Sequence, residues 1–431
     1  TFNIFSGPGN NGGDGLAIAR MLLEAGKKVK VILLNPFNRM SDDCKEQRIR
    51  LLNIDKQCIT EINAVWNPSV IHPSEVNIDA IFGIGLTRPA EAIFGAAIDF
   101  MNDSGKPTIA IDIPSGIYSD KVSLNSGNKT VKASITLTFG TLKRGLLIGE
   151  NAPWYGTVHV LDIGLDQEFL DSAESKTEVT DQNLLTQIYV PKQEFSHKGT
   201  FGHGLLITGQ TGQMGASVLM AKGYLKGGGG LLTLMVPKSE RQILQSSVPE
   251  AMNIFIEDKL PDLERYAAIG VGPGLGNGTG RKELMKSLLT QFRGKLILDA
   301  DALNLLSDDS DLLKMVPPGS LLTPHPGEFR KLAGVWKNDF HKLEMQLAFA
   351  KKYKVVLVLK GKNTSIATPS GHLYFNPTGN AGMAKGGSGD ILAGLLTSLL
   401  ASGYESLNAA ILGTWIHGAA GDLAAAKLTP E

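Results

Sequence analysis

Short apolar segments alternate with amphipathic segments along most of this chain of 431 residues. In the first 165 residues, apolar runs of strand length are separated by segments whose apolar residues recur at helical spacing. Strands are expected at residues 4–5, 29–34, 78–82, 108–113, 134–139 and 157–163, and helices at residues 16–24, 45–52 and 90–102. Nearly continuous apolar strands separated by helices predict a mostly parallel sheet that is covered on both faces.

This alternation stops between residues 166 and 198, where acidic residues accumulate with little apolar periodicity. It restarts with strands expected at residues 204–208, 231–236, 267–271, 296–299, 321–323 and 355–360, and helices at 216–226, 282–292, 342–351, 390–400 and 407–426. We therefore predict a Rossmann-like doubly wound domain at residues 1–170, a linker at 171–185 and a second α/β domain at 186–431. The chain opens inside its first strand without an initiator Met, so we expect that a segment upstream is missing.

Composition and charge exclude several classes of protein. Lys+Arg and Asp+Glu both number 42, and a formal charge of zero provides no basic field that would hold nucleic acid. No stretch approaches the roughly 18 unbroken apolar residues that a membrane span requires. Cys44 and Cys58 lack metal-ligand spacing, which favours a reducing, cytoplasmic location. The 50 glycines gather in short loops, where the backbone must approach another group closely.

The first glycine loop follows the first predicted strand and reads Gly7-Pro8-Gly9-Asn10-Asn11-Gly12. It satisfies the G-x-G-x-x-G pattern, which exposes backbone N–H groups to an anionic ligand at a helix N-terminus. A dinucleotide-binding fold also requires an acidic residue at the end of the second strand, and Asn35-Pro36 stands there. Two interpretations stay open: a tight strand–helix turn capped by Asp14, or a ligand loop of two carboxamides and a carboxylate.

Two further loops follow strands of the same predicted sheet. Residues 79–89 carry Asp79 and Arg88, and residues 112–116 carry Asp112 and Ser115. The C-terminal ends of strands in a doubly wound sheet converge on one crevice. Taken singly, Asp79 is explained by capping a strand end and Asp112 by a turn. Together with the first loop, these strings resemble the epimerase family that interconverts the two epimers of hydrated NADH and NADPH.

The resemblance implies that one set of loop residues contacts the hydrated dinucleotide: Asn10, Asn11, Gly12, Gly13, Asp14, Gly83, Ile84, Gly85, Leu86, Thr87, Arg88, Pro89 and Asp112. It implies a potassium ion held by Asn11, Asp79 and Ser115, and it makes Asp112 the candidate acid/base. The helical segment that the family carries before the first strand is absent from this chain. A domain that only binds ligand or mediates assembly therefore remains an alternative.

A second glycine-rich segment, at residues 386–389, precedes Asp390 and a helix that is apolar nearly all round. Consecutive N–H groups at a helix N-terminus form an anion nest that suits a phosphoryl group. Asp390 is expected to stay ionised, because the helix dipole and the amides favour its charged form, and it can then accept a hydroxyl proton. A plain N-cap is the alternative interpretation. The chain has no G-x-x-x-x-G-K-[ST] string, which excludes a P-loop NTPase.

This G-x-G-D signature resembles ribokinase-like folds, and further strings narrow the resemblance. Residues 323–328 hold His325 between two prolines, residues 299–304 hold Asp299 and Asp301, and residues 272–276 are glycine-rich. With His197-Lys198-Gly199, they resemble the NAD(P)H-hydrate dehydratase family. The resemblance places the hydrated dinucleotide against Ala216, Gly274, His325 and Asp390. It places ADP or ATP against Lys360, Gly361, Lys362, Asn363, Thr364, Asn380, Ala381, Gly382, Met383, Ala384, Lys385, Gly386, Gly387, Ser388 and Gly389. Read alone, Lys360 is a strand-end lysine and His325 a structural histidine.

The two resemblances imply a bifunctional repair enzyme, an isomerase and a lyase in one chain, that acts on hydrated NADH and NADPH (NADHX and NADPHX). The N-terminal domain would equilibrate the R and S forms. The ribokinase-like α/β domain would dehydrate the S form with Mg²⁺, converting ADP to AMP, or ATP to ADP, and phosphate. We favour ADP, because fusion of the domains is mainly a bacterial arrangement, and we expect a homo-oligomer built through the dehydratase domain. A vitamin-precursor or sugar kinase is the first alternative, and a nicotinamide oxidoreductase is the least favoured.

Overall fold

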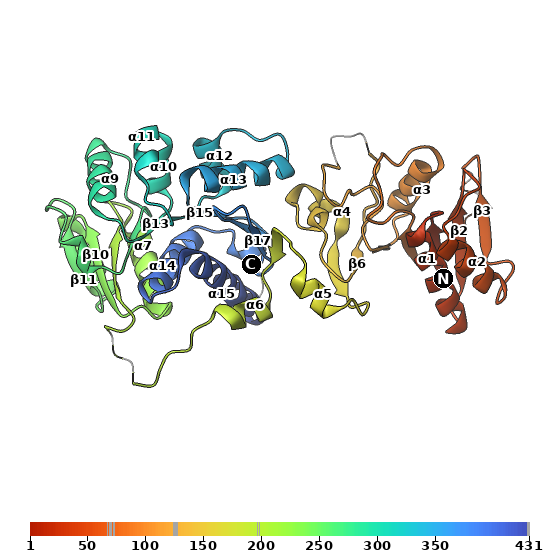
Figure 1. Ribbon diagram of the computed structural model, residues 1–431, viewed down its shortest axis with the longest axis horizontal. Helices are drawn as coiled ribbons and strands as arrows, with labels where there is room; N and C mark the ends of the chain where they lie inside the picture. The colour runs from red at the N-terminus through yellow and green to blue at the C-terminus, as the bar shows by residue number, and fades with distance from the viewer. Residues whose placement is uncertain are drawn as a thin grey trace. The chain divides into compact units, whose positions relative to one another are not determined.

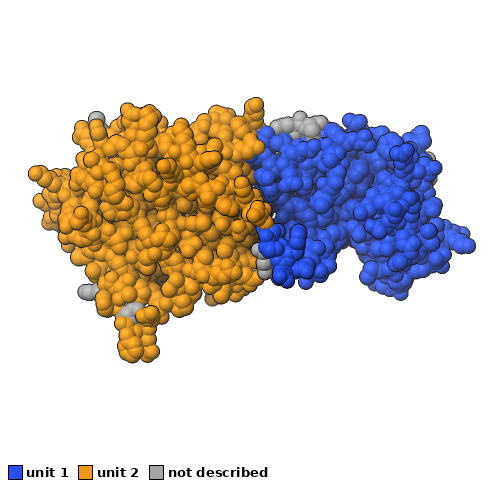
Figure 2. Space-filling model, viewed as in Figure 1, with its two compact units in different colours: residues 1–173, 338–340 blue, residues 174–337, 341–431 orange. Residues whose placement is uncertain are grey.

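The computed structural model of the chain describes residues 1–66, 68, 71, 74–123, 128–195, 197 and 199–428. The chain divides into two compact units, residues 1–173 with 338–340 and residues 174–337 with 341–431, which are coloured separately in Figure 2. Each unit is built around its own sheet. No helix in these described ranges is long and apolar enough to span a bilayer.

The sheet of the first unit has seven strands, all of whose pairings are parallel. In spatial order the strands are β3 (Ile59–Ile62), β2 (Val29–Leu34), β1 (Phe2–Ser6), β4 (Val76–Ala80), β5 (Thr108–Ile111), β6 (Ile135–Phe139) and β7 (Thr157–Leu161). The helices are α1 (Asn10–Glu24), α2 (Asp42–Leu52), α3 (Ala92–Asp103), α4 (Ala152–Tyr155) and α5 (Gln167–Ser172), with 3-10 turns η3 (Arg144–Leu146) and η4 (Gly149–Asn151).

Helices cover both faces of this sheet. On one face Leu16 of α1 and Leu51 of α2 lie in one buried cluster with strand residues, and on the other Phe94 and Ile98 of α3 lie in a second cluster. From β1 the chain adds β2 and β3 on one side of the sheet and then β4 to β7 on the other, so the strand order reverses between β1 and β4. In a doubly wound fold the crevice lies at the C-terminal ends of the strands at this point. The structure therefore confirms the predicted Rossmann-like architecture.

Helix α1 begins earlier than the sequence pattern predicts. We expected a loop as far as Gly15, but the helix starts at Asn10, so the Asn-Asn-Gly-Gly-Asp segment forms its first turns. Glycine is needed there because the helix lies against backbone. A Cβ placed on Gly12 would lie 1.8 Å from the carbonyl oxygen of Gly7. Small residues thus let the helix start directly over the end of β1.

The sheet of the second unit has ten strands. In spatial order they are β11 (Met252–Phe255), β10 (Leu231–Val236), β9 (His203–Ile207), β12 (Ala268–Val271), β13 (Lys295–Leu298), β14 (Leu321–Leu322), β15 (Val356–Leu359), β16 (Thr364–Ala367), β17 (Leu373–Asn376) and β8 (Thr177–Val179). The first seven are parallel, β16 is antiparallel to both its neighbours, and β8 pairs parallel with β17. The segment predicted as a linker thus contains β8 and the start of the next helix.

The helices of the second half of the chain are α6 (Gln182–Ile188), α7 (Met214–Lys226), α8 (Arg241–Ser247), α9 (Thr279–Gln291), α10 (Asp301–Ser307), α11 (Ser310–Met315), α12 (Pro326–Ala333), α13 (Asp339–Tyr353), α14 (Ser388–Ala401) and α15 (Ser406–Lys427). Short 3-10 turns are η5 (Lys238–Glu240), η6 (Leu263–Arg265) and η7 (Ala381–Met383). In Figure 1, α9 to α12 lie on one side of the strands, and α14 and α15 on the other.

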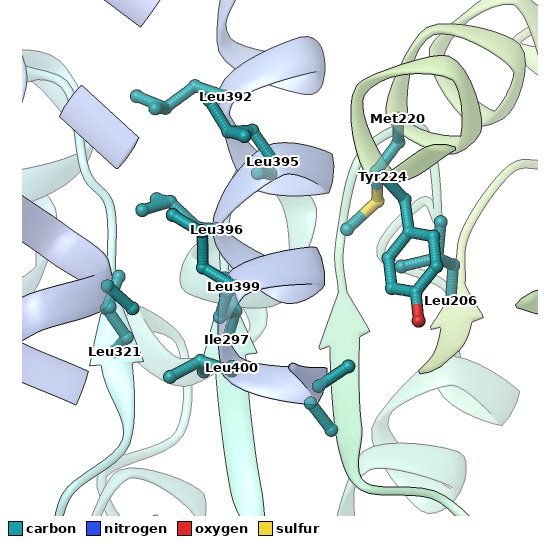
Figure 3. Packing of buried hydrophobic residues seen from close by; sticks show 14 of the residues in the cluster. Leu206, Met220, Tyr224, Ile297, Leu321, Leu392, Leu395, Leu396, Leu399 and Leu400 are labelled. Carbon is teal, nitrogen blue, oxygen red and sulfur yellow. The ribbon is translucent and has the colours of Figure 1, made fainter. Parts of the chain in front are cut away.

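Helix α14 is the centre of the second hydrophobic core. Its Leu396, Leu399 and Leu400 are buried beside strand residues such as Ile297 and Leu321 (Figure 3). Burying one such leucine contributes about 2 kcal/mol to the free energy of unfolding. The core therefore holds α14 firmly, and with it the residues at its N-terminus.

Two glycines bring α14 against α7 backbone to backbone. A Cβ on Gly394 would lie 1.9 Å from the carbonyl oxygen of Met220, and a Cβ on Gly223 would lie 2.3 Å from that of Ile391. At these two positions there is therefore no space for a side chain between the helices. This close packing fixes the position of the first turn of α14 relative to α7.

Candidate active sites

Three of the predicted substrate-binding loops of the first unit meet at the switch point. A Cβ placed on Gly83, after β4, would lie 3.3 Å from Oδ2 of Asp112 and 3.4 Å from Cγ of Asn11. Asn11 is in the first turn of α1, and Asp112 directly follows β5. The backbone of Gly83 therefore lies against the side chains of both Asn11 and Asp112. Residues that are far apart in the sequence thus form one site.

Asp79 and Ser115 are bonded to each other beneath this site. The hydroxyl of Ser115 donates to Oδ1 of Asp79 at 2.6 Å, and its backbone N–H donates to Oδ2 at 2.7 Å. The backbone N–H of Ile81 donates to Oδ1 at 3.2 Å. Complete burial nevertheless raises the pKa of Asp79 to about 6, against these hydrogen bonds. The carboxyl is satisfied by neutral donors, which leaves room for a cation to stabilise its charge.

The side chain of Asn11 has no hydrogen-bond partner among the residues that the structure describes. Both its Oδ1 and its Nδ2 are buried and unpaired, which is costly unless a ligand satisfies them. No group of three or more His, Cys, Asp or Glu residues in the described ranges is arranged to hold a metal ion. A neutral amide oxygen, a hydroxyl and one carboxylate instead form an oxygen-rich, low-charge set, of the kind that suits a hard cation.

The remaining predicted substrate residues of this unit differ in their exposure. Asp14, four positions into α1, has a raised pKa because its carboxyl is partly buried and because the charge of Asp112 is near. In the loop after β4, Leu86 is buried, whereas Thr87 and Arg88 are exposed. Asn10, Ile84 and Gly85 are exposed as well, Pro89 is half-buried, and Gly12 and Gly13 are buried in the first turns of α1.

Lys143 is a residue of this site that the sequence pattern did not reveal. Its ammonium nitrogen lies 2.6 Å from Oδ1 of Asp112, and both side chains are nearly buried, at 13% and 11% exposed. Lys143 stands in an irregular segment after β6, with no glycine motif to mark it. The contact joins positions 31 apart in the chain, and only the folded sheet brings them together.

In the second unit, most predicted nucleotide residues line one cavity of about 910 Å³. The predicted residues on its wall are His325, Lys360, Gly361, Lys362, Thr364, Asn380, Ala381, Met383, Ala384, Lys385, Gly386, Ser388, Gly389 and Asp390. Gly387, Asn363 and Gly382 belong to the same segments but are not on the wall. Ala216 and Gly274 also lie off the wall, although a Cβ on Gly274 would come within 3.2 Å of that of Ala216. Lys198 is outside the described residues.

An ion pair stands at the base of this cavity. Nζ of Lys360 lies 2.8 Å from Oδ1 of Asp299, whose side chain is 2% exposed. Ala300 follows with φ +48°, a left-handed conformation that turns the chain sharply. The turn sends Asp301 away from the cavity wall, where its Oδ2 accepts from the backbone N–H of Gly276 at 2.9 Å. A Cβ on Gly389 would lie 3.4 Å from Nζ of Lys360, so the pair lies under the glycine-rich turn.

The pKa of Asp390 differs in direction from our sequence-based expectation. We expected the helix dipole and the amides to favour the charged form. Burial raises the pKa to about 6, the charges of Asp299 and Asp301 raise it as well, and Lys360 lowers it. The expectation was wrong because it ignored the burial of the carboxyl, which is the largest cause, and the charges of Asp299, after β13, and Asp301, at the start of α10. At neutral pH the group is still mostly ionised and can accept a proton.

His325 is held in one tautomer by its own helix. Its Nδ1 accepts hydrogen bonds from the backbone N–H groups of Gly327 at 3.0 Å and of Glu328 at 3.3 Å. The Glu328 carboxylate in turn accepts from the backbone N–H of His325 at 2.8 Å, which completes a capping box. With Nδ1 used as an acceptor, the proton of the neutral ring is on Nε2. His325 can therefore act as a hydrogen-bond donor on the cavity wall.

The C-terminal helix contributes residues that we did not predict. His417 lines the cavity, and burial and the charge of Lys360 lower its pKa, while a hydrogen bond to the Ser388 backbone opposes the shift. Asp422 accepts from the backbone N–H of Gly379 and from Nδ2 of Asn380, both at 2.9 Å. A signal was present in the sequence, since glycines are unfavourable within helices and α15 has several. A Cβ on Gly418 would lie 2.2 Å from Oγ1 of Thr378, so the nucleotide-loop residues lie directly on the helix.

Comparison with known proteins assigns both halves of the chain. A family model described as NAD(P)H-hydrate dehydratase matches residues 204–430, and one described as YjeF-related protein N-terminus matches residues 1–145. The bifunctional NAD(P)H-hydrate repair enzyme of Moorella thermoacetica is 36% identical over 98% of this chain and 83% of its own length. That of Escherichia coli is 32% identical over 98% of this chain and 81% of its own.

Solved structures match the second half. The ADP/ATP-dependent NAD(P)H-hydrate dehydratase from Bacillus subtilis, co-crystallised with ATP and Mg²⁺, is 30% identical with a TM-score of 0.53, covering 59% of this chain and 92% of its own. A ribokinase-like superfamily protein from Enterococcus faecalis is 26% identical with a TM-score of 0.54, covering 60% and 93%. These matches confirm the predicted ribokinase-like fold of the second unit.

Proposed function

The chain belongs to the family of bifunctional NAD(P)H-hydrate repair enzymes, and from that membership we propose how its two sites divide the repair of hydrated NADH and NADPH. The first unit epimerises the R and S hydrates, and the second dehydrates the S form at the expense of ADP or ATP. The observation that carries the second assignment is one cavity that holds Asp390, the Lys360–Asp299 pair and the glycine-rich turn.

Asp390 acts as the base of the dehydration. Its carboxylate accepts the proton of the ring hydroxyl while the hydroxyl oxygen takes the phosphoryl group from the nucleotide, which leaves as AMP or ADP. Phosphate then departs with the electron pair of its C–O bond, the neighbouring ring carbon loses a proton, and the dihydronicotinamide double bond is restored. Phosphorylation is useful because hydroxide is a poor leaving group. The backbone N–H groups at residues 386–389, at the N-terminus of α14, stabilise the transferring charge.

Magnesium is a proposed requirement of the second site. Asp299, on the cavity wall, is the carboxylate that would organise it, whereas Asp301 lies off the wall and accepts from the backbone N–H of Gly276; neither belongs to a three-ligand cluster among the described residues. That sparse set fits Mg²⁺, which is usually held by one or two carboxylates together with substrate phosphates. When bound, the ion neutralises charge on the nucleotide. The nucleotide itself would lie against residues 360–364 and 380–389, and the hydrated ring against Ala216, Gly274 and His325.

The epimerase site is proposed at the crevice of the first unit, with Asp112 as acid/base and with residues 10–14 and 83–89 around the hydrated dinucleotide. Asn11, Asp79 and Ser115 would hold potassium. The fit rests on the unpaired, buried amide of Asn11 and on a fully buried carboxyl that has only neutral donors among the described residues. The ion would supply a positive charge beside the pyrophosphate-bearing ligand. Chromatography of R and S forms with and without K⁺ tests this assignment.

Assembly and location are also proposals. We expect a homo-oligomer built through the dehydratase unit, which sedimentation of the intact chain would test. Both cysteines are free and buried, as suits a reducing cytoplasm. ADP remains the favoured donor. Parallel assays with ADP and ATP at equal concentration would identify it by the larger kcat/KM.

The replacement Asp390→Asn tests the dehydratase assignment. It keeps the shape of the side chain but removes the base, so dehydration of the S hydrate should be lost while nucleotide binding is largely retained. Binding is measured by calorimetry with ADP, and turnover by the recovery of dihydronicotinamide absorbance. Turnover at the parent rate would exclude Asp390 as the base.

A further inference from the structure

Lys143 is anchored at two points beside Asp112. Its ammonium lies 2.6 Å from Oδ1 of Asp112 and donates to the carbonyl oxygen of Phe139 at 2.7 Å. Phe139 is the last residue of β6, and its own backbone N–H donates to the same Oδ1 at 3.4 Å. The lysine therefore bridges the ends of two neighbouring strands. An ammonium group that makes two such bonds has a well-defined position.

The two oxygens of Asp112 have different surroundings. Oδ1 is occupied by Lys143 and Phe139, whereas Oδ2 is the atom that approaches the ligand loop at Gly83. Asp112 itself has φ +66°, a left-handed conformation that is unfavourable in a residue with a side chain. Such a conformation persists only where surrounding contacts enforce it. The contact with Lys143 therefore selects which carboxylate oxygen faces the crevice.

The charges around Asp112 also require a cation. Asp14 approaches from α1, and each carboxylate lies within electrostatic range of the other. Bringing two carboxylates to one site is unfavourable unless a positive charge compensates them. Lys143 approaches from the β6 side and is the cation that pairs with Asp112. Buried ion pairs are weak sources of stability, so a pair kept at this place indicates a role in the site.

We propose that Lys143 is a positioning residue of the epimerase: it holds Oδ1 of Asp112 so that Oδ2 is presented to the reacting carbon of the hydrated ring. The proposal rests on the epimerase function proposed above. It assigns no contact between Lys143 and substrate. Its effect is expected in kcat, because a mispositioned base impairs proton transfer more than it impairs binding of the dinucleotide.

The test uses the full chain and purified R hydrate of NADH, without nucleotide, so that the dehydratase is idle. Appearance of the S form is followed by chromatography for the parent chain, Lys143→Met, Lys143→Ala and Asp112→Asn. The control is Lys45→Met, which removes an exposed lysine of the same unit that lies 2.8 Å from Asp42. Thermal unfolding and dehydration of the S form with ADP report whether each variant is folded.

We expect Lys143→Met to lower kcat by about 30-fold or more, with KM within about threefold of the parent value. Ethylammonium should restore part of the activity of Lys143→Ala with saturation, because it replaces the missing ammonium. Lys45→Met should match the parent chain. The inference is overturned if folded Lys143→Met retains kcat within threefold, if its defect is entirely in KM, or if ethylammonium fails to rescue folded Lys143→Ala. A parent chain that cannot epimerise the R hydrate would remove the epimerase function itself, and the role of Lys143 with it.

Discussion

The pH dependence of the dehydratase follows from the surroundings of Asp390. The perturbation is a change of pH across the pKa of about 6 that burial and the charge of Asp299 impose on this carboxyl. Catalysis requires the ionised form, because the carboxylate accepts a proton. A raised pKa in a base means that activity is present above pH 6 and is lost as the pH falls through that value.

The magnitude follows from simple titration. With a pKa of about 6, the ionised fraction is about 0.9 at pH 7 and about 0.1 at pH 5, so kcat/KM should fall about tenfold between these values. A carboxyl with the ordinary pKa of about 3.9 would stay more than nine-tenths ionised at pH 5 and show almost no loss. The two cases therefore differ by about an order of magnitude in one assay.

The assay is kcat/KM for the S hydrate of NADH at saturating nucleotide, corrected at each pH for decay without enzyme. Asp390→Asn should be about 10²–10⁴ slower and lack this acidic limb. The control is Asp311→Asn, which removes an exposed carboxyl that pairs with Lys314, and its profile should match the parent chain. A parent profile that is flat down to pH 5 would refute the account of the burial and charge around Asp390.

Three further predictions concern stability. Asp79 has a folded pKa of about 6 against 3.8 in the unfolded chain, so its burial should lower the free energy of unfolding of the first unit by about 3 kcal/mol above pH 6. In denaturant unfolding, the free energy of unfolding of the parent chain should therefore rise relative to that of Asp79→Asn as the pH falls from 7.5 to 5. K⁺ should stabilise the parent chain more at pH 7.5 than at pH 5. Equal pH profiles for the two chains would contradict this. Gly394→Ala, whose Cβ would lie 1.9 Å from the Met220 carbonyl oxygen, should lower the free energy of unfolding by at least about 1–3 kcal/mol, whereas an unchanged denaturant midpoint would disprove that contact. Lys360→Met leaves the buried Asp299 without its cation and should cost about 3–5 kcal/mol in the same measurement, and a neutral effect would show that the pair does not form.

Hydrophobic periodicity was sufficient to predict the central parallel strands of both sheets. The predicted strands and helices around the two crevices are present, because a long apolar run such as residues 231–236 is buried within the sheet, between two neighbouring strands. Short strands of four residues were missed. Residues 59–62 form β3 although Glu61 interrupts their pattern, and residues 364–367 and 373–376 form a hairpin next to a glycine-rich turn. In such strands the neighbouring strand, not the local pattern, decides the conformation.

The site residues that sequence motifs mark are those in glycine-rich loops. Lys143 and His417 were missed because they belong to no such motif and act through contacts with distant positions. The direction of the pKa shift of Asp390 was missed because its largest cause, burial, and the approach of Asp299 both depend on the folded structure. Local sequence indicates where a helix begins and which dipole acts there. The charges that face that helix depend on how the strands are ordered.

The most direct test of the account is the recovery of dihydronicotinamide absorbance from hydrated NADH, with ADP, with ATP and without nucleotide. We predict recovery only when a nucleotide is present, one phosphate released for each dihydronicotinamide formed, and consumption of the R form as well as the S form. Nucleotide that is bound and consumed without recovery, leaving a phosphorylated small molecule instead of free phosphate, would contradict it.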